Sequence, residues 1–163
     1  MKTRKKLGLI LMAILSCWAT GCVSHRVTIA YADWHYPPPV QGHQPVIDAS
    51  INGVSGHFVI DTGAMGPVLT ITAVHRCSIG VTSSHGSVVG ADGDKMKMLE
   101  ATNVTVRFSN NYVIHWPVIL VLPNDLATPP GMNGTLFGVL DYQTLRTHGA
   151  VMDMKQKTIT LTK

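Results

Sequence analysis

The chain has 163 residues, a length that favours a single compact domain with room for one additional segment. Lys and Arg number 13 against 9 Asp and Glu, but Lys2, Arg4, Lys5 and Lys6 stand together at the N-terminus. Without these residues the opposite charges balance at 9 each, and no Lys/Arg cluster remains in the rest of the chain. The basic pI therefore gives no sign of a nucleic-acid partner, and none is predicted.

Residues 1–21 have the pattern of a secretory signal peptide. The basic residues precede an apolar stretch over residues 7–18, which is too short to span a hydrocarbon layer of about 30 Å as a stable helix. The small residues before Cys22 resemble a bacterial lipobox, which implies acylation of Cys22 and attachment to the membrane through lipid. Val23 follows, and by resemblance to Gram-negative lipoproteins this implies an outer-membrane protein that faces the periplasm. Ordinary cleavage of the signal and an uncleaved N-terminal anchor are the alternatives, and all three predict an exported domain.

Residues 22–44 predict an extended tether between the acylated Cys22 and a folded domain over residues 45–163. The segment contains Pro37-Pro38-Pro39 and little periodicity, a composition that favours the polyproline II conformation. Its aromatic residues Tyr31, Trp34 and Tyr36 allow another interpretation, in which the segment packs against the domain or contributes a strand to a dimer.

From residue 45 the pattern predicts β structure. Residues 46–51 alternate, Asn52-Gly53 is a strong hairpin signal, and Phe58-Val59-Ile60 belongs to a returning strand that ends at Asp61. The apolar run would fix the backbone of Asp61, the Thr62-Gly63 turn would let other backbone approach, and burial would raise the pKa of the carboxyl. Asp61 is therefore a candidate catalytic carboxylate, and a turn or helix-capping role is the alternative.

The rest of the chain predicts further short strands and two short helices. Residues 82–93 are rich in Ser and Gly and predict a mobile hairpin with Gly90-Ala91-Asp92-Gly93 at its tip. Helices are expected over residues 72–78 and 142–147, and a final hairpin is expected around residues 154–157.

Cysteine and histidine patterns indicate neither a disulfide nor a metal site. Export and lipidation would leave Cys77 as the one thiol, for which a buried position is favoured. The eight His residues are scattered, without the spacing of a zinc motif. No metal and no cofactor is therefore predicted.

Four motifs occur in one order along residues 45–161. They are the Asn-Gly hairpin leading into Asp61-Thr62-Gly63-Ala64, the Gly90-Ala91-Asp92-Gly93 tip, Leu136-Phe137-Gly138 before a helix, and Ala150-Val151-Met152-Asp153 near the end. In this order they resemble the retropepsin-like aspartic peptidases. The resemblance covers nearly all of the predicted domain, and it implies an all-β fold, a single-lobe acid-protease barrel with one or two short helices.

The resemblance also implies how the site would work. Such peptidases hold one water between two carboxylates, which titrate as a coupled pair because both cannot ionise at short distance. This chain has one Asp-Thr-Gly, so the second Asp61 would come from an identical subunit in a homodimer. Thr62 would hydrogen-bond across the two loops, Gly63 would present its N–H to the carboxylate, and Ala64 would line the cleft. Residues 90–93 would form a flap that closes over an extended peptide.

The chain departs from the family pattern at two places. Met65-Gly66-Pro67 follows Ala64 where a polar residue is more usual, and this could alter hydrogen bonding near the carboxylate. Asp141 follows Gly138 by three residues rather than two, which could shift the start of the next helix by one residue.

The sequence predicts a homodimeric aspartic endopeptidase of the bacterial cell envelope that acts on a peptide or protein substrate. The alternative is a non-catalytic lipoprotein of the same fold that serves as a binding or assembly module. A third hypothesis is a peptidase that acts only on its own precursor or on one envelope partner.

Overall fold

The computed structural model describes residues 24–35, 42–89, 93, 95–124, 126 and 134–163. The signal peptide expected over residues 1–21 and the expected lipidation site Cys22 lie outside these residues, as do Gly90, Ala91 and Asp92 of the expected flap. Over the described ranges, no helix is long and apolar enough to cross a membrane.

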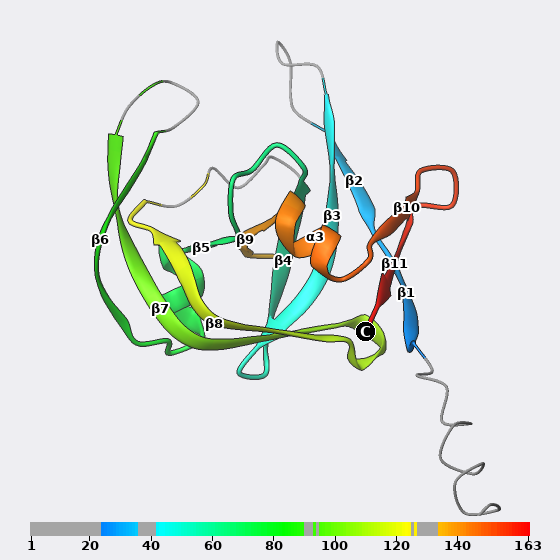
Figure 1. Cartoon of the computed structure of the whole chain (residues 1–163), viewed down its shortest axis with the longest axis horizontal. Coiled ribbons are helices and arrows are strands. Elements are labelled where there is room, and N and C mark those ends of the chain that lie inside the picture. Colours follow the sequence, from blue (N-terminus) through cyan, green and yellow to red (C-terminus); the bar gives the residue numbers. More distant parts are fainter. Residues whose placement is uncertain (1–23, 36–41, 90–92, 94, 125, 127–133) are drawn as a thin grey trace, which may run out of the picture.

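The described residues form two β-sheets with two short α-helices (Figure 1). The larger sheet has eight strands in the order β2-β3-β4-β9-β5-β8-β7-β6, and an additional pairing of β3 with β7 closes it into a barrel. The smaller sheet has the order β1-β11-β10. This architecture confirms the predicted all-β barrel. The strands are β1 (Arg26–Ala30), β2 (Ala32–His35), β3 (His43–Ile51), β4 (Val54–Asp61), β5 (Val68–Thr70), β6 (Val81–Val89), β7 (Lys95–Phe108), β8 (Val113–Leu122), β9 (Leu136–Asp141), β10 (Val151–Asp153) and β11 (Thr158–Thr162), with one 3-10 turn, η2 (Ser109–Asn111).

Phe58 on β4 lies at the centre of the hydrophobic core. Its ring is fully buried and faces the rings of Phe108, Trp116 and Phe137 at centroid distances of 6.1, 6.3 and 6.4 Å. These three rings come from β7, β8 and β9, so the strand that carries Asp61 is packed against three other strands at once. Close packing of this kind holds side chains and backbone in one arrangement. The end of β4 therefore has a fixed position.

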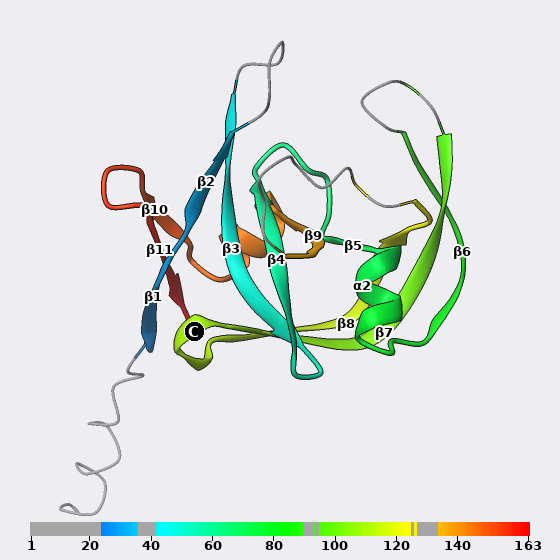
Figure 2. The same ribbon diagram turned by 180° about the vertical axis from the view of Figure 1, so that it is seen from behind.

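The first helix, α2 (Ile71–Arg76), begins and ends earlier than the predicted 72–78. Thr70 is its N-cap, because the hydroxyl accepts a hydrogen bond from the Ala73 N–H at 3.1 Å and donates one to the Leu136 carbonyl at 2.8 Å. The helix contacts β5, β8 and β9, as Figure 2 shows from behind. Cys77, its C-cap, is buried, and this burial raises the pKa of the thiol.

The tether expected over residues 22–44 is wrong for residues 26–35, which form strands. β1 pairs antiparallel with β11, from Arg26 opposite Thr162 to Ala30 opposite Thr158, and β2 pairs with β3. Val27, Ile29 and Tyr31 alternate with exposed residues and are buried, and the Tyr31 hydroxyl donates to the Met154 sulfur at 3.3 Å. Burial of three apolar side chains on one face outweighs the tendency of the neighbouring Pro-rich segment to stay extended. The folded domain thus begins before residue 45.

A β-bulge in β9 lies immediately before Gly138. β4 and β9 are parallel, and Leu136 pairs with His57 while Gly138 pairs with the next residue, Phe58, so Phe137 is the additional residue. From Gly138 onward the pairing is regular, so Asp141 lies in register with Asp61, and it immediately precedes α3 (Tyr142–Thr147). The helix therefore starts at the predicted residue, and the start is not shifted.

Candidate active site

Asp61 is the last residue of β4 and begins a tight turn. Its Oδ1 accepts a hydrogen bond from the Gly63 N–H at 2.8 Å, and its carbonyl accepts one from the Ala64 N–H at 3.2 Å. A Cβ on residue 63 would stand only 3.3 Å from Oδ1, so Gly suits this close approach. Within the described part of the chain, Oδ2 of Asp61 has no hydrogen-bond partner. The side chain is partly exposed, and the next two residues, Thr62 and Gly63, are exposed.

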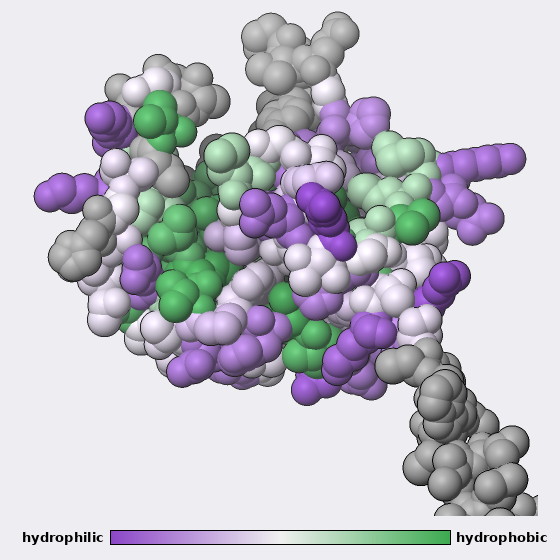
Figure 3. Space-filling view, viewed as in Figure 1, coloured by the Kyte–Doolittle hydropathy of each residue, from purple (hydrophilic) through white to green (hydrophobic). Residues whose placement is uncertain are grey.

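The Asp61 turn forms one wall of a cleft of about 570 Å³. Among the described residues that line the cleft, Asp61 is the only ionisable one, and the other side chains are apolar. Figure 3 shows hydrophobic residues gathered in the hollow between the β6–β7 hairpin and the body of the domain. The cleft therefore presents one carboxylate in an apolar surrounding. Its lining consists of Asp61, Gly63, Ala64, Met65, Gly66, Val68, Val89, Met96, Leu120, Leu122 and Val139.

The hairpin of β6 and β7 forms the opposite wall. Val89 ends β6 and Met96 lies near the start of β7, so the two residues flank the predicted flap tip. Gly93, the one described residue of that tip, has a φ of +87°, a backbone conformation that favours Gly. The hairpin extends beyond the barrel in Figure 1. Gly90, Ala91 and Asp92 of the expected flap lie outside the described residues, so the flap stays a prediction.

A close crossing of β5 and β9 supports the floor of the cleft. A Cβ on residue 138 would stand 2.0 Å from the Val68 carbonyl oxygen, so Gly138 permits the two strands to pair as they do. Leu69 of β5 pairs with Gly138 and is fully buried. Gly138 of the Leu136-Phe137-Gly138 motif is therefore required for steric reasons. The close pairing of β5 with β9 places Val68 and Val139 beside Asp61 in the lining.

Asp141 lies in register with Asp61 but has a different role. It is fully buried, and its two carboxylate oxygens accept hydrogen bonds from the N–H groups of Gln143 and Thr144, both at 3.0 Å. These are the first N–H groups of α3, which a helix cannot satisfy internally. Asp141 is therefore an N-cap and does not line the cleft.

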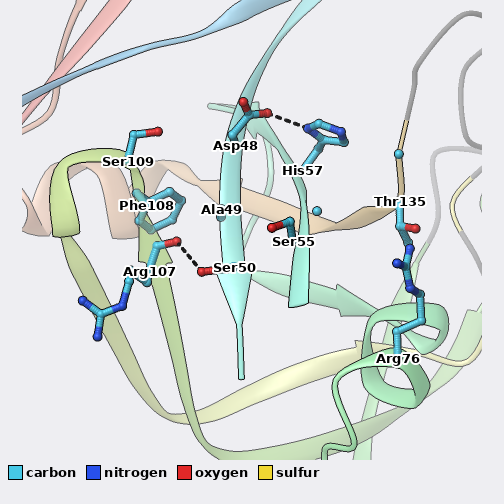
Figure 4. Close-up of a pocket in the computed structure, with 12 residues that line it drawn as sticks. Asp48, Ala49, Ser50, Ser55, His57, Arg76, Arg107, Phe108, Ser109 and Thr135 are labelled. Carbon is cyan, nitrogen blue, oxygen red and sulfur yellow. Dashed lines mark hydrogen bonds and ion pairs between the residues drawn. The ribbon is translucent and has the colours of Figure 1, made fainter. Parts of the chain in front are cut away.

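A second, more polar hollow of about 530 Å³ lies over the β3–β4 hairpin (Figure 4). Asp48 and His57 pair across the two strands, with 2.7 Å between Oδ1 and Nδ1, and Asp48 faces solvent as predicted. Gly134 packs so closely on His57 that a Cβ there would stand 2.4 Å from Nε2. His57 thus lies between Asp48 and the backbone of residue 134, an arrangement that joins β4 to the segment before β9.

The sequence predicts the Asp61 turn but not most of the cleft. Val89, Met96, Leu120, Leu122 and Val139 come from β6, β7, β8 and β9, and no local motif marks them. The one feature they share in the sequence is that they are apolar residues within strands, and the residues of the hydrophobic core have the same feature. In the described residues, no group of three or more His, Cys, Asp or Glu residues could hold a metal ion.

Comparisons with known proteins identify the family and the fold. The sequence matches the aspartyl protease family over residues 47–140, more than half of the chain. No curated protein matches it. Similar solved structures are a retroviral protease-like domain of Ddi1 from Leishmania major (16% identity, TM-score 0.52, 83% of this chain and 89% of that one) and a retropepsin-like aspartic protease from Rickettsia conorii (16% identity, TM-score 0.52, 85% and 91%). The EIAV protease in complex with the inhibitor HBY-793 is also similar (19% identity, TM-score 0.50, 74% and 100%). The chain therefore belongs to the aspartyl protease family and has the retropepsin-like fold.

Proposed function

We propose that the protein is a homodimeric aspartic endopeptidase in which each subunit contributes Asp61 to one shared site. The observation that carries this proposal is the cleft itself, where a single carboxylate stands partly exposed in an apolar lining. Its Oδ1 is held by the Gly63 N–H, which leaves Oδ2 for a water or for the partner's loop. An oriented carboxylate of this kind can take a proton from water.

Peptide hydrolysis by this chemistry requires a second carboxylate. One carboxyl keeps its proton and polarises the peptide carbonyl, while the other removes a proton from the attacking water. Asp141 cannot serve as the second group, because both of its oxygens cap α3 and it is fully buried. The second Asp61 must therefore come from another copy of the chain, and the two would titrate as one coupled pair.

Features on one side of the molecule support such a dimer. The β6–β7 hairpin, the loop after β4 and the β10–β11 turn all reach the upper side in Figure 1. Within the described residues, β10 pairs with β11 along one edge only, and Val151 on β10 is 67% exposed. An unpaired strand edge with apolar side chains readily accepts another strand. We infer that β10 meets β10 of a second subunit, with the exposed Thr62 of each loop near the two-fold axis.

We also propose that the protein works in the cell envelope. Support comes from the N-terminal sequence, with its basic residues, its apolar stretch and the lipobox-like residues before Cys22. Palmitate labelling and fractionation of cells that express the full chain would test this, with Cys22→Ala as the comparison. Export without labelling would favour ordinary signal cleavage.

A subunit-mixing experiment tests the shared site. Hydrolysis of a mixed peptide library is measured for the wild type, for Asp61→Asn, and for an equal mixture refolded together. A site shared by two subunits leaves about a quarter of the wild-type activity in the mixture, whereas a site within one chain leaves about half. The Asp61→Asn homodimer should be inactive while its sedimentation coefficient is unchanged.

Two results would contradict the proposal. Cleavage by Asp61→Asn at the wild-type rate excludes Asp61 as the catalytic group. A chain that stays monomeric at every concentration, with and without a peptide-like aspartic-peptidase inhibitor, favours the binding or assembly module of the same fold.

A further inference from the structure

The turn between β10 and β11 is held by the segment that joins β1 to β2. The Tyr31 N–H donates to the Lys157 carbonyl at 2.9 Å, and the Tyr31 hydroxyl donates to the Met154 sulfur at 3.3 Å, although the latter two residues are 123 positions apart in the sequence. Asp33, at the second position of β2, has its Oδ2 3.0 Å from Lys157 Nζ. We call these three contacts the clamp, and Figures 1 and 2 show the turn beside β2.

Lys157 has a backbone conformation that is unusual for its residue type. Its φ is +51°, in the left-handed region that costs free energy for a residue with a Cβ. Every other non-glycine residue with a positive φ in the described part of the chain is Asn or Ser, whose short side chains can bond locally. The Lys157 side chain instead reaches Asp33. The turn thus has a strained residue in place of Asn, and the strained residue makes the ion pair of the clamp.

The clamp joins the turn to well-packed parts of the domain. Tyr31 is buried, and the Asp33 side chain is only 17% exposed, whereas that of Lys157 is 55% exposed. The hydrogen bond from Lys157 holds the pKa of the Asp33 carboxyl below its ordinary value, so the carboxylate stays charged at neutral pH. An ion pair with one nearly buried partner restricts the mobile lysine more than a pair between two solvated side chains does. The position of the turn therefore depends on Tyr31 and Asp33.

Strand β10 has little other support. It is three residues long, and within the described residues it pairs with β11 alone. The turn that carries Met154 and Lys157 follows it directly. Under the proposed function the open edge of β10 meets the same edge of a second subunit. Ordering this edge only during association would lower the affinity, so a turn that is fixed beforehand favours assembly.

We propose that Asp33 and Lys157 are positioning residues for assembly of the shared site, because their ion pair fixes the β10–β11 turn before the second subunit binds. The inference rests on the proposed function, since it requires contact between the β10 strands of two subunits. It assigns a role in assembly to the segment that links Cys22 to the barrel. Loosening this segment from the turn weakens the dimer, although no clamp residue lines the Asp61 cleft.

Lys157→Asn in the full chain, purified in detergent, separates assembly from folding. Asn suits the positive φ but carries no charge for Asp33. The free energy of unfolding of the monomer, measured by urea denaturation in dilute solution, should therefore not fall. The dissociation constant of the dimer, measured by sedimentation equilibrium, should rise about 10-fold, because each of the two subunits loses the pair. Above that concentration the variant should reach the wild-type kcat for peptide hydrolysis.

Two further variants control for charge and for location. Asp48→Asn removes the other ion pair of the described residues, Asp48 with His57 at 2.7 Å, which lies on the β3–β4 hairpin. It should keep the wild-type dissociation constant. The charge-swapped chain with Asp33→Lys and Lys157→Asp should recover most of the affinity that Lys157→Asn loses, because opposite charges meet again at the same positions.

The outcomes distinguish the clamp from the proposed function. A wild-type dissociation constant in Lys157→Asn, an equal loss in Asp48→Asn, or no recovery in the charge-swapped chain would each overturn the role of the ion pair. A lowered kcat in fully dimeric Lys157→Asn would also overturn it, because positioning for assembly acts on the dissociation constant alone. In all these cases a dimeric, active wild type leaves the proposed function standing. A wild-type chain that stays monomeric at every concentration contradicts the proposed function itself, and the clamp's role in assembly with it.

Discussion

Asp61 and Asp141 end two neighbouring parallel strands at the same register position, each after an apolar run. Their carboxylates nevertheless have different surroundings. Asp141 is fully buried and gives both oxygens to the backbone of α3, whereas Asp61 is partly exposed and gives one oxygen to the Gly63 N–H. The residues that follow decide the difference, because Tyr142 continues into a helix and Thr62-Gly63 turns at the surface.

This comparison shows that a strand-end Asp is not by itself a sign of catalysis. A carboxylate whose lone pairs are used by buried N–H groups stabilises the fold and cannot move protons for a substrate. A carboxylate with one oxygen fixed and the other open to a cleft is oriented but still available. Availability of an oxygen atom, rather than position in the strand, separates the two residues.

The largest effect is expected for activity in Asp61→Asn. This change should lower kcat/KM for peptide hydrolysis by at least about 100-fold, since the amide cannot act as the base. The melting temperature should stay near that of the wild type because the side chain is partly exposed. Asp141→Asn provides the comparison. Its folded molecules should keep the wild-type activity per active site, with the number of active sites determined by inhibitor titration. Loss of activity in Asp141→Asn with full folding would break the comparison.

A second prediction concerns the strand that carries Asp141. Gly138→Ala would place a methyl group against the Val68 carbonyl oxygen, and neither backbone can move without disturbing the β5–β9 pairing. We expect a loss of about 3 kcal/mol or more in the free energy of unfolding, measured by urea denaturation. Gly80→Ala is the control, because nothing lies within 4 Å of a Cβ at that residue. Equal stabilities would show that β9 can shift.

Removal of the cap should have an intermediate effect. Asp141→Ala would leave two N–H groups of α3 without acceptors in a buried place, and should cost about 1–2 kcal/mol. Asp153 makes a similar pair of bonds to the N–H groups of Lys155 and Gln156, at 2.9 and 2.8 Å, but in an exposed turn. Asp153→Ala should therefore cost less, within about 0.5 kcal/mol, in the same denaturation series. A reversed order would contradict the importance of burial.

The smallest effect is expected at the other end of α3. Burial, and then the charge of Lys163, lowers the pKa of His148 below its ordinary value of 6.5, and the ring lies 2.7 Å from the Tyr112 hydroxyl. The unfolded chain thus binds more protons than the folded one in mild acid, so this part of the stability is present above about pH 6.5 and is lost as the pH falls through the lowered pKa.

Thermal unfolding at several pH values checks this dependence. His148→Asn should show a smaller decrease in melting temperature between about pH 8 and about pH 5 than the wild type does. His115→Asn removes an exposed imidazole on β8 and serves as the control. An unchanged slope in His148→Asn would mean that other groups determine the acid sensitivity.

Local signals in the sequence were sufficient for the β3–β4 hairpin, the position of Asp61 at a strand end and the helix over Tyr142–Thr147. Asn52-Gly53 and the alternation around it, and the Asp141 cap, act within a few residues, so the chain displays them directly. The Asp61 turn also matched a known family motif.

The missed features depend on contacts between distant parts of the chain. β1 is only five residues long and depends on β11, more than a hundred residues later, for its hydrogen bonds. The bulge at Phe137 depends on the pairing with β4, and the apolar lining of the cleft depends on how β6 and β7 fold over the Asp61 turn. Alternation identifies an apolar face, but it does not distinguish a side chain in the core from one in a cleft.

The early start of β1 limits how far the domain can move if Cys22 carries lipid. Arg26 is already paired with Thr162, so residues 23–25 are all that separate the acylated cysteine from the sheet. Three extended residues reach about 10 Å. The barrel would then lie directly on the lipid surface, and its cleft would meet only those polypeptides that approach that surface. Confinement to one plane would also raise the encounter frequency of two subunits, so that assembly of the shared site would depend on the density of anchored chains.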